Sequence, residues 1–240
     1  MQHSNAYTFR FAAMVTIVCS VLLAGAATLL KPRQDENKLL DKKKNILISV
    51  GIEPVNGENF TRSEINETYA NRIKELVIDL KGNIVEGKKP SDLDPGKDTE
   101  LLPIYESIKD GEISAYVLPV SGKGLWSTIN GYLALSSDGV TVKGITFYSH
   151  GETPGLGGEI EKEWFTNNFI GKKIADENGT LVSINVVKGK VDPASEKAIH
   201  QVDGISGATL TANGVSNFLK EDLKTYEPFL KTIMNLKGGV

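Results

Sequence analysis

The chain has 240 residues, a formal net charge of −3 and 24% charged residues. This is the composition of an ordinary globular protein, and it lacks the basic stripe with interleaved aromatic residues that nucleic-acid binding requires. One cysteine and three histidines exclude an internal disulfide and give no Cys/His cluster of metal-ligand spacing, so we expect neither a nucleic-acid partner nor a metal site.

The first predicted element is a membrane anchor. Residues 11–30, FAAMVTIVCSVLLAGAATLL, carry no charge, and a helix of 20 residues spans about 30 Å, the thickness of the hydrocarbon core of a bilayer. A cleaved signal peptide is the alternative, because AGAA at 24–27 resembles a cleavage site. Positive charges are denser after this segment than before it, which on charge alone favours a cytoplasmic domain.

Apolar residues at helical spacing predict further helices before residue 100. One covers residues 33–50. The next begins at the capping box formed by Thr61 and Glu64 and continues for about five turns, through Leu80. Residues 87–100 read as a loop. We therefore expect an N-terminal tail at 1–10, a transmembrane helix at 11–30, a juxtamembrane helical region at 31–100 and a further domain at 101–240.

Strand patterns dominate the rest of the chain. They predict a strand at 112–122, with Pro119 at an edge or an end, a two-stranded hairpin at 131–152 that turns at 137–139, and a strand at 179–189. Helical spacing returns at 159–174 and again from residue 210 onward. The predicted fold is therefore α+β, a mainly antiparallel sheet with packed helices.

Two glycine-rich segments precede predicted helices. The first, HGETPGLGGEIEKEW at 150–164, matches neither a phosphate loop nor a dinucleotide fingerprint. Its Gly155 and Gly157 would let the backbone approach a flat ligand, and Glu152 and Thr153 add polar groups. A plain turn before a helix is the alternative.

The second segment is VDGISGATLTANGV at 202–215. A helix start presents free N–H groups and a positive dipole end, which suit phosphate, and small residues leave room for it. The hydroxyls of this segment allow three roles: a helix cap, a donor to phosphate, or a covalent attachment point. The residues alone leave these roles open. A third segment, 121–132, places Lys123 and Trp126 in a turn that is either structural or contacts a ligand.

Behind one membrane helix, these three segments resemble the C subunits of the bacterial Na⁺-translocating NADH:quinone oxidoreductases. The flavin-binding domain of that family is shared with the G subunit of the Rnf electron-transport complex. The motif that carries the resemblance is D-x-x-[ST]-G-A-T, here Asp203–Thr209, accompanied by GKGLW at 122–126 and GETPGLGGE at 151–159. The similarity extends over nearly the whole chain.

The resemblance implies an FMN joined by a phosphodiester to Thr209 and a separate flavin transferase that makes the bond from FAD. Thr211 is the next candidate if a label survives the loss of Thr209. Gly207 and Ala208 would leave room for the phosphate and the ribityl chain. Ser206 would cap the helix or donate to phosphate, and Asp203 would serve recognition by the transferase or cap the turn. The remaining expected flavin contacts are Leu125, Trp126 and Leu156 on the ring faces, Glu152 and Thr153 at the polar edge, and Gly155 and Gly157 beside the ring.

The implied function is that of an electron carrier between NADH and ubiquinone, coupled to sodium export. It would work with the other subunits of its complex in the lipid of the bacterial inner membrane. The resemblance implies a single-pass anchor with the domain on the periplasmic side, whereas the flanking charges favour the cytoplasmic side. The alternatives are the G subunit of an Rnf complex and a membrane-tethered module that binds a small anion without redox chemistry.

Overall fold

The computed structural model describes residues 4–55, 57–94 and 96–237. It divides into two units, Met1–Asp41 and Lys42–Val240. Helix α1, Asn5–Ser49, runs from the first unit into the second. The predicted anchor and the predicted juxtamembrane helix are thus one helix, which continues through Pro32. In the first unit the apolar side chains of α1 are exposed, and this helix is long and apolar enough to cross a membrane.

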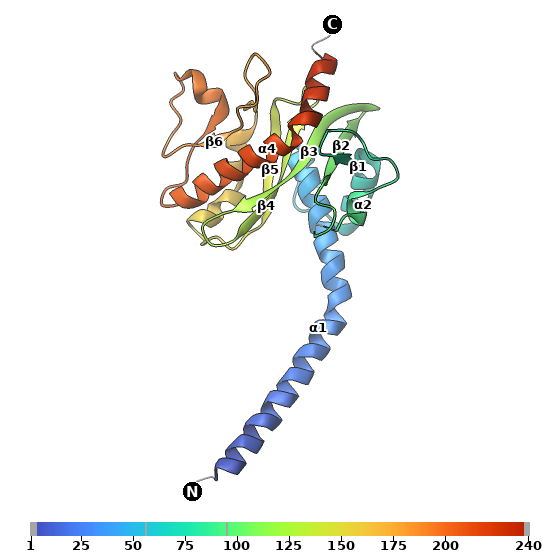
Figure 1. The fold of residues 1–240 in the computed structure, drawn as a ribbon, viewed down its shortest axis with the longest axis vertical. Coiled ribbons are helices and arrows are strands. Elements are labelled where there is room, and N and C mark those ends of the chain that lie inside the picture. Colours follow the sequence, from blue (N-terminus) through green and yellow to red (C-terminus); the bar gives the residue numbers. More distant parts are fainter. Residues whose placement is uncertain (1–3, 56, 95, 238–240) are drawn as a thin grey trace. The chain divides into compact units, whose positions relative to one another are not determined.

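An antiparallel sheet of five strands is the centre of the second unit (Figure 1). Its strands are β1 (Ile73–Asp79), β2 (Leu101–Lys109), β3 (Glu112–Lys123), β4 (Thr128–Ser136) and β5 (Val142–Ser149). They lie side by side in chain order, so each strand pairs with the next one along the sequence. The predicted turn at 137–139 joins β4 to β5, and the predicted antiparallel sheet is confirmed.

Helix α4, Thr209–Lys237, covers one face of this sheet (Figure 1). Alternate residues of β3 point toward it, because side chains alternate between the two faces of a strand. Tyr116, Leu118 and Val120 join the apolar core, together with Val215, Phe218, Leu219, Leu223 and Leu230 of α4. Glycines let the helix approach closely: a Cβ on Gly214 would lie 2.5 Å from the carbonyl oxygen of Lys123.

Within the second unit, the last turns of α1 and helix α2, Arg62–Arg72, pack against the sheet. Ile46 and Leu47 of α1 are fully buried, and a Cβ on Gly144 of β5 would lie 2.5 Å from the carbonyl oxygen of Ser49. Buried tyrosines extend this layer, with Tyr105 and Tyr132 in edge-to-face contact. With both faces covered, β3 and β4 carry runs of buried residues rather than a strict alternation.

Two predictions about secondary structure are wrong. The helix that starts at the capping box of Thr61 ends at Arg72, and the residues that follow form β1, which pairs with β2. Strand β2 itself was not predicted. The predicted helix at 159–174 is a series of short turns: the 3₁₀ helices Gly157–Glu161 and Asn167–Phe169, with α3 (Glu163–Thr166) between them.

Other predictions hold in part. Strand β3 is central in the sheet, but its pairing with β2 stops at Val117, so Pro119 lies where one side of β3 faces no strand. The predicted strand at 179–189 shortens to β6, Asn185–Val186, which pairs in parallel with β7, Gln201–Val202. This small pair connects the segment before Lys190 with the segment before Thr209. Further 3₁₀ helices lie at Pro90–Asp92 and Glu196–His200.

Candidate functional site

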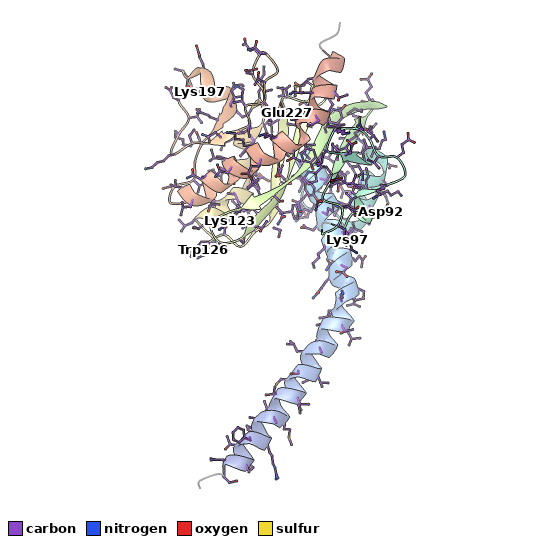
Figure 2. The ribbon with its side chains drawn as sticks, viewed as in Figure 1. Asp92, Lys97, Lys123, Trp126, Lys197 and Glu227 are labelled. Carbon is purple, nitrogen blue, oxygen red and sulfur yellow. The ribbon has the colours of Figure 1, made fainter. Side chains whose placement is uncertain are left out.

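The turn between β3 and β4 presents apolar side chains to solvent. The N–H of Gly124 donates to the carbonyl of Ser127 at 2.8 Å, which closes the turn. Leu125 and Trp126 lie between these residues, and Trp126 is 71% exposed. Figure 2 labels Lys123 and Trp126 at this end of the second unit. An exposed tryptophan on a closed turn is an unusual use of a large apolar side chain and suits contact with a flat ligand.

Glu152 lies at the centre of the site and is buried. Its carboxylate accepts hydrogen bonds from the backbone N–H groups of Leu125 (3.2 Å), Trp126 (2.9 Å) and Ser127 (3.3 Å), and from the hydroxyl of Thr211 (2.6 Å). Burial opposes the charge on this group, but the hydroxyl and the three N–H groups outweigh it and hold the pKa of the Glu152 carboxyl below its usual value.

The rest of the glycine-rich loop wraps around the carbonyl of Thr153. That oxygen accepts from the N–H groups of Leu156 (3.1 Å) and Gly158 (2.9 Å). Gly155 has φ = +74°, a backbone conformation that favours glycine. The side chains of Thr153 and Leu156 are exposed, whereas Gly157 is buried. Leu156 lies over the start of α4, since a Cβ on Gly207 would be 2.9 Å from its Cδ2 atom.

The start of α4 provides free donors. Ala208 precedes the helix and is buried, and its carbonyl accepts the N–H of Ala212. Within the described residues, no carbonyl accepts from the N–H groups of Thr209, Leu210 or Thr211. The hydroxyl of Ser206 is exposed and makes no hydrogen bond to any described residue, so Ser206 does not cap the helix in this structure.

The two threonines differ sharply. Thr209 is exposed, whereas Thr211 is 1% exposed and its hydroxyl donates to Glu152. One turn of helix has 3.6 residues, so positions two apart point in nearly opposite directions. Thr209 therefore faces outward when Thr211 faces the core.

A cavity of about 350 Å³ lies beside Thr209. It is lined by small residues of the segment 204–207 and by two lysines, Lys188 and Lys190, from the loop after β6. Asn213 of α4 completes it. The sequence prediction did not include Lys188, Lys190 or Asn213. The spacing of these residues in the sequence does not indicate that the lysines lie near Thr209. The lysines lie there because β6, which precedes them, pairs with β7, which precedes Thr209.

Asp203 holds this loop. Its carboxylate accepts from Lys190 Nζ at 2.7 Å and from the N–H of Val191 at 2.8 Å. The hydrogen bond from Lys190, followed by that from Val191, lowers the pKa of the Asp203 carboxyl. A carboxylate near an expected phosphate is thus turned toward a lysine, and it anchors the cationic loop next to the start of α4.

Comparisons with known proteins find relatives over most of the chain. Residues 124–224 match the model of the FMN-binding domain family. The chain is 42% identical to the C subunit of a Na⁺-translocating NADH-quinone reductase of Pseudomonas aeruginosa, over 91% of each chain, and 39% identical to that of Yersinia pestis, over 94% of this chain and 92% of the relative. A crystal structure of the corresponding C subunit from Parabacteroides distasonis superposes with a TM-score of 0.73 at 35% identity, covering 84% of this chain and 96% of that one.

Proposed function

Since this chain belongs to the family of the C subunits of Na⁺-translocating NADH-quinone reductases, we propose that it holds a covalent FMN on Thr209. The flavin would be joined by a phosphodiester to the Thr209 hydroxyl. The protein would carry electrons on the path from NADH to ubiquinone, in a complex that exports sodium.

The start of α4 supports attachment at Thr209. Thr209 is exposed, and three free N–H groups lie at the same helix start. Lys188 and Lys190 line the adjoining cavity. A phosphodiester keeps one negative charge, which a helix start stabilises by about 0.3–1 kcal/mol at an exposed site. Thr211 is a poorer candidate because its hydroxyl is buried and donates to Glu152.

The neighbouring loops support a place for the ring. Leu125, Trp126 and Leu156 are exposed apolar side chains on segments that meet the start of α4. We propose that they cover the ring faces, with Thr153 at a polar edge and Gly155 and Gly157 allowing close approach. When bound, the flavin supplies the redox chemistry. The residues of this chain bind it, orient it and limit its contact with water.

Maturation and assembly complete the proposal. A flavin transferase would form the bond from FAD, using the segment Asp203–Thr209 to recognise its target. The apolar part of α1 would anchor the chain in the lipid of the bacterial inner membrane, with the domain on the periplasmic side. Other subunits of the complex would supply and accept the electrons. Sodium movement would belong to those subunits, because one apolar helix provides no path for an ion.

The exposed hydroxyl of Thr209 at the open helix start is the observation that carries the proposal, and it can be tested directly. The full chain is co-expressed with a flavin transferase, purified in detergent and denatured. We expect yellow fluorescence that stays with the polypeptide and an intact mass raised by one FMN less one water. Thr209→Val should abolish the label, and Thr211→Val, the matched control, should keep it.

Three results would contradict the proposal. A label that survives in Thr209→Val would show that the flavin is attached to another residue. A wild-type chain that remains colourless despite an active transferase would favour the module that binds an anion without redox chemistry. Co-purification of the chain with an Rnf complex instead of the sodium-translocating reductase would assign it to the alternative electron-transport system.

A further inference from the structure

Four donors converge on one buried side chain at the flavin site. The Oε1 atom of Glu152 accepts from the N–H groups of Trp126 and Ser127, and Oε2 accepts from the N–H of Leu125 and the hydroxyl of Thr211. Three consecutive N–H groups of one turn thus surround a carboxylate that comes from another loop. With its oxygens occupied in this way, Glu152 is poorly placed to bond the ring itself, although the sequence suggested that it could.

Glycines enclose the same carboxylate on two sides. A Cβ on Gly124 would lie 2.6 Å from Glu152 Oε1, and a Cβ on Gly157 would lie 2.9 Å from Oε2 and 2.5 Å from the Thr211 hydroxyl. None of these three distances is compatible with a side chain unless the carboxylate or the Thr211 hydroxyl moves. The two glycine-containing loops and the first turn of α4 therefore fit together around Glu152.

The charge on Glu152 has no cationic partner in the part of the chain that the structure describes. Among the described residues, no Lys, Arg or His side chain lies within ion-pair distance of Glu152. The described groups that stabilise the charge are three N–H dipoles and one hydroxyl, as in the concave anion sites that consecutive N–H groups form. A negative charge therefore remains behind the turn that presents Leu125 and Trp126.

We propose that Glu152 is a positioning residue of the flavin site, which fixes the turn Leu125–Ser127 against the first turn of α4 and, through its charge, lowers the reduction potential of the flavin. This inference rests on the proposed function. Adding an electron to a group near an uncompensated negative charge is disfavoured. The carboxylate touches the backbone that carries the ring contacts, so its effect on the flavin is indirect.

The test compares three variants of the flavin-loaded full chain in detergent. Glu152→Gln keeps the shape but removes the charge and turns an NH₂ group toward N–H donors. Thr211→Val keeps the charge and removes one donor. Glu163→Gln is the matched control, because it removes an exposed carboxylate of α3 from the segment that follows the loop.

Two readouts separate positioning from general stability. Hydrogen exchange of the amides of Leu125, Trp126 and Ser127 should accelerate at least tenfold in Glu152→Gln and stay unchanged in Glu163→Gln. The flavin midpoint potential should shift to a more positive value in Glu152→Gln only. In Thr211→Val the potential should not become more positive, and exchange of Leu125 should accelerate, because Glu152 loses the hydrogen bond that holds it to the first turn of α4.

Unchanged exchange and an unchanged potential in Glu152→Gln would overturn the inference. If Glu152→Gln does not fold, Thr211→Val decides: unchanged exchange at Leu125, or a more positive potential, would overturn it. Failure of the proposed function looks different, because the wild-type chain would then carry no flavin, while the exchange rates of the three amides would still report on the role of Glu152.

Discussion

Replacing Asp222 by Asn should stabilise the protein at neutral pH and have little effect in acid. Asp222 lies on α4, where its Oδ2 atom accepts from the N–H of Ser121 in β3 at 2.7 Å. Burial raises the pKa of the Asp222 carboxyl to about 6; the Ser121 N–H acts in the opposite direction, and the neighbouring Glu221 adds to the rise. The N–H that Asp222 accepts belongs to the part of β3 beyond its pairing with β2.

The magnitude follows from the two pKa values. The carboxyl titrates at 3.8 when unperturbed and at about 6 in the folded chain. A group whose pKa is higher in the folded state favours folding below its unfolded pKa, and this contribution disappears as the pH rises through the folded pKa. The difference corresponds to at most about 3 kcal/mol, all of it lost above pH ~7. An asparagine still accepts the Ser121 N–H but carries no charge.

The assay is urea denaturation of the full chain in detergent between pH 4 and pH 8, followed by the fluorescence of Trp126 and Trp164. The advantage of Asp222→Asn over wild type should grow between pH 4 and pH 7 and then level off. Glu163→Gln, an exposed carboxylate, should show no such trend. A difference that does not change with pH, or a wild type that is more stable than Asp222→Asn at pH 8, would refute the reasoning.

Three other substitutions test the packing around the site by the same denaturation assay. Gly214→Ala should lower the free energy of unfolding by about 1–3 kcal/mol, since its Cβ would lie 2.5 Å from the carbonyl of Lys123; a gain would show that α4 does not approach β3 so closely. Phe165→Ala should cost about 3–5 kcal/mol, because this ring is fully buried; a cost under about 1 kcal/mol would contradict that burial. Lys190→Met should cost less than about 1 kcal/mol, because its ion pair with Asp203 is largely exposed on the lysine side; a larger loss would give that pair a structural role.

Local patterns were sufficient to predict some elements of the fold and not others. The membrane-length helix, the β4–β5 hairpin and α4 are each specified by nearby residues: an uncharged run, a turn at 137–139 and a helical stripe of apolar side chains. β1 was mistaken for helix because Ile73, Leu76, Val77 and Leu80 also satisfy helical spacing. Their pairing with β2, which lies more than 20 residues away, decides the outcome, and no local pattern contains that information.

The site was predicted unevenly for the same reason. The motif Asp203–Thr209 and the segments 122–126 and 151–159 are each a continuous run of sequence. The structure brings the last two together around Glu152, with Thr211, two residues after the motif. Lys188 and Lys190 were missed because the short parallel pair of β6 and β7 carries them to Thr209. The partner of Asp203, Lys190, was missed with them, so the sequence assigned this carboxylate only to recognition by the transferase or to capping the turn.

The position where α4 begins determines which of its first two threonines is exposed. Small residues at 206–208 delay the helix until Thr209, and Gly207, with φ = +76°, sets the direction in which the chain enters it. From that start, helical phase turns Thr211 inward to Glu152 and leaves Thr209 outside, so the buried carboxylate also removes the competing hydroxyl from reach. The proposed attachment at Thr209 rather than Thr211 would thus follow from the same packing that orients the turn at Trp126. Disturbing the carboxylate should therefore affect both the shape of the site and the choice of attachment point.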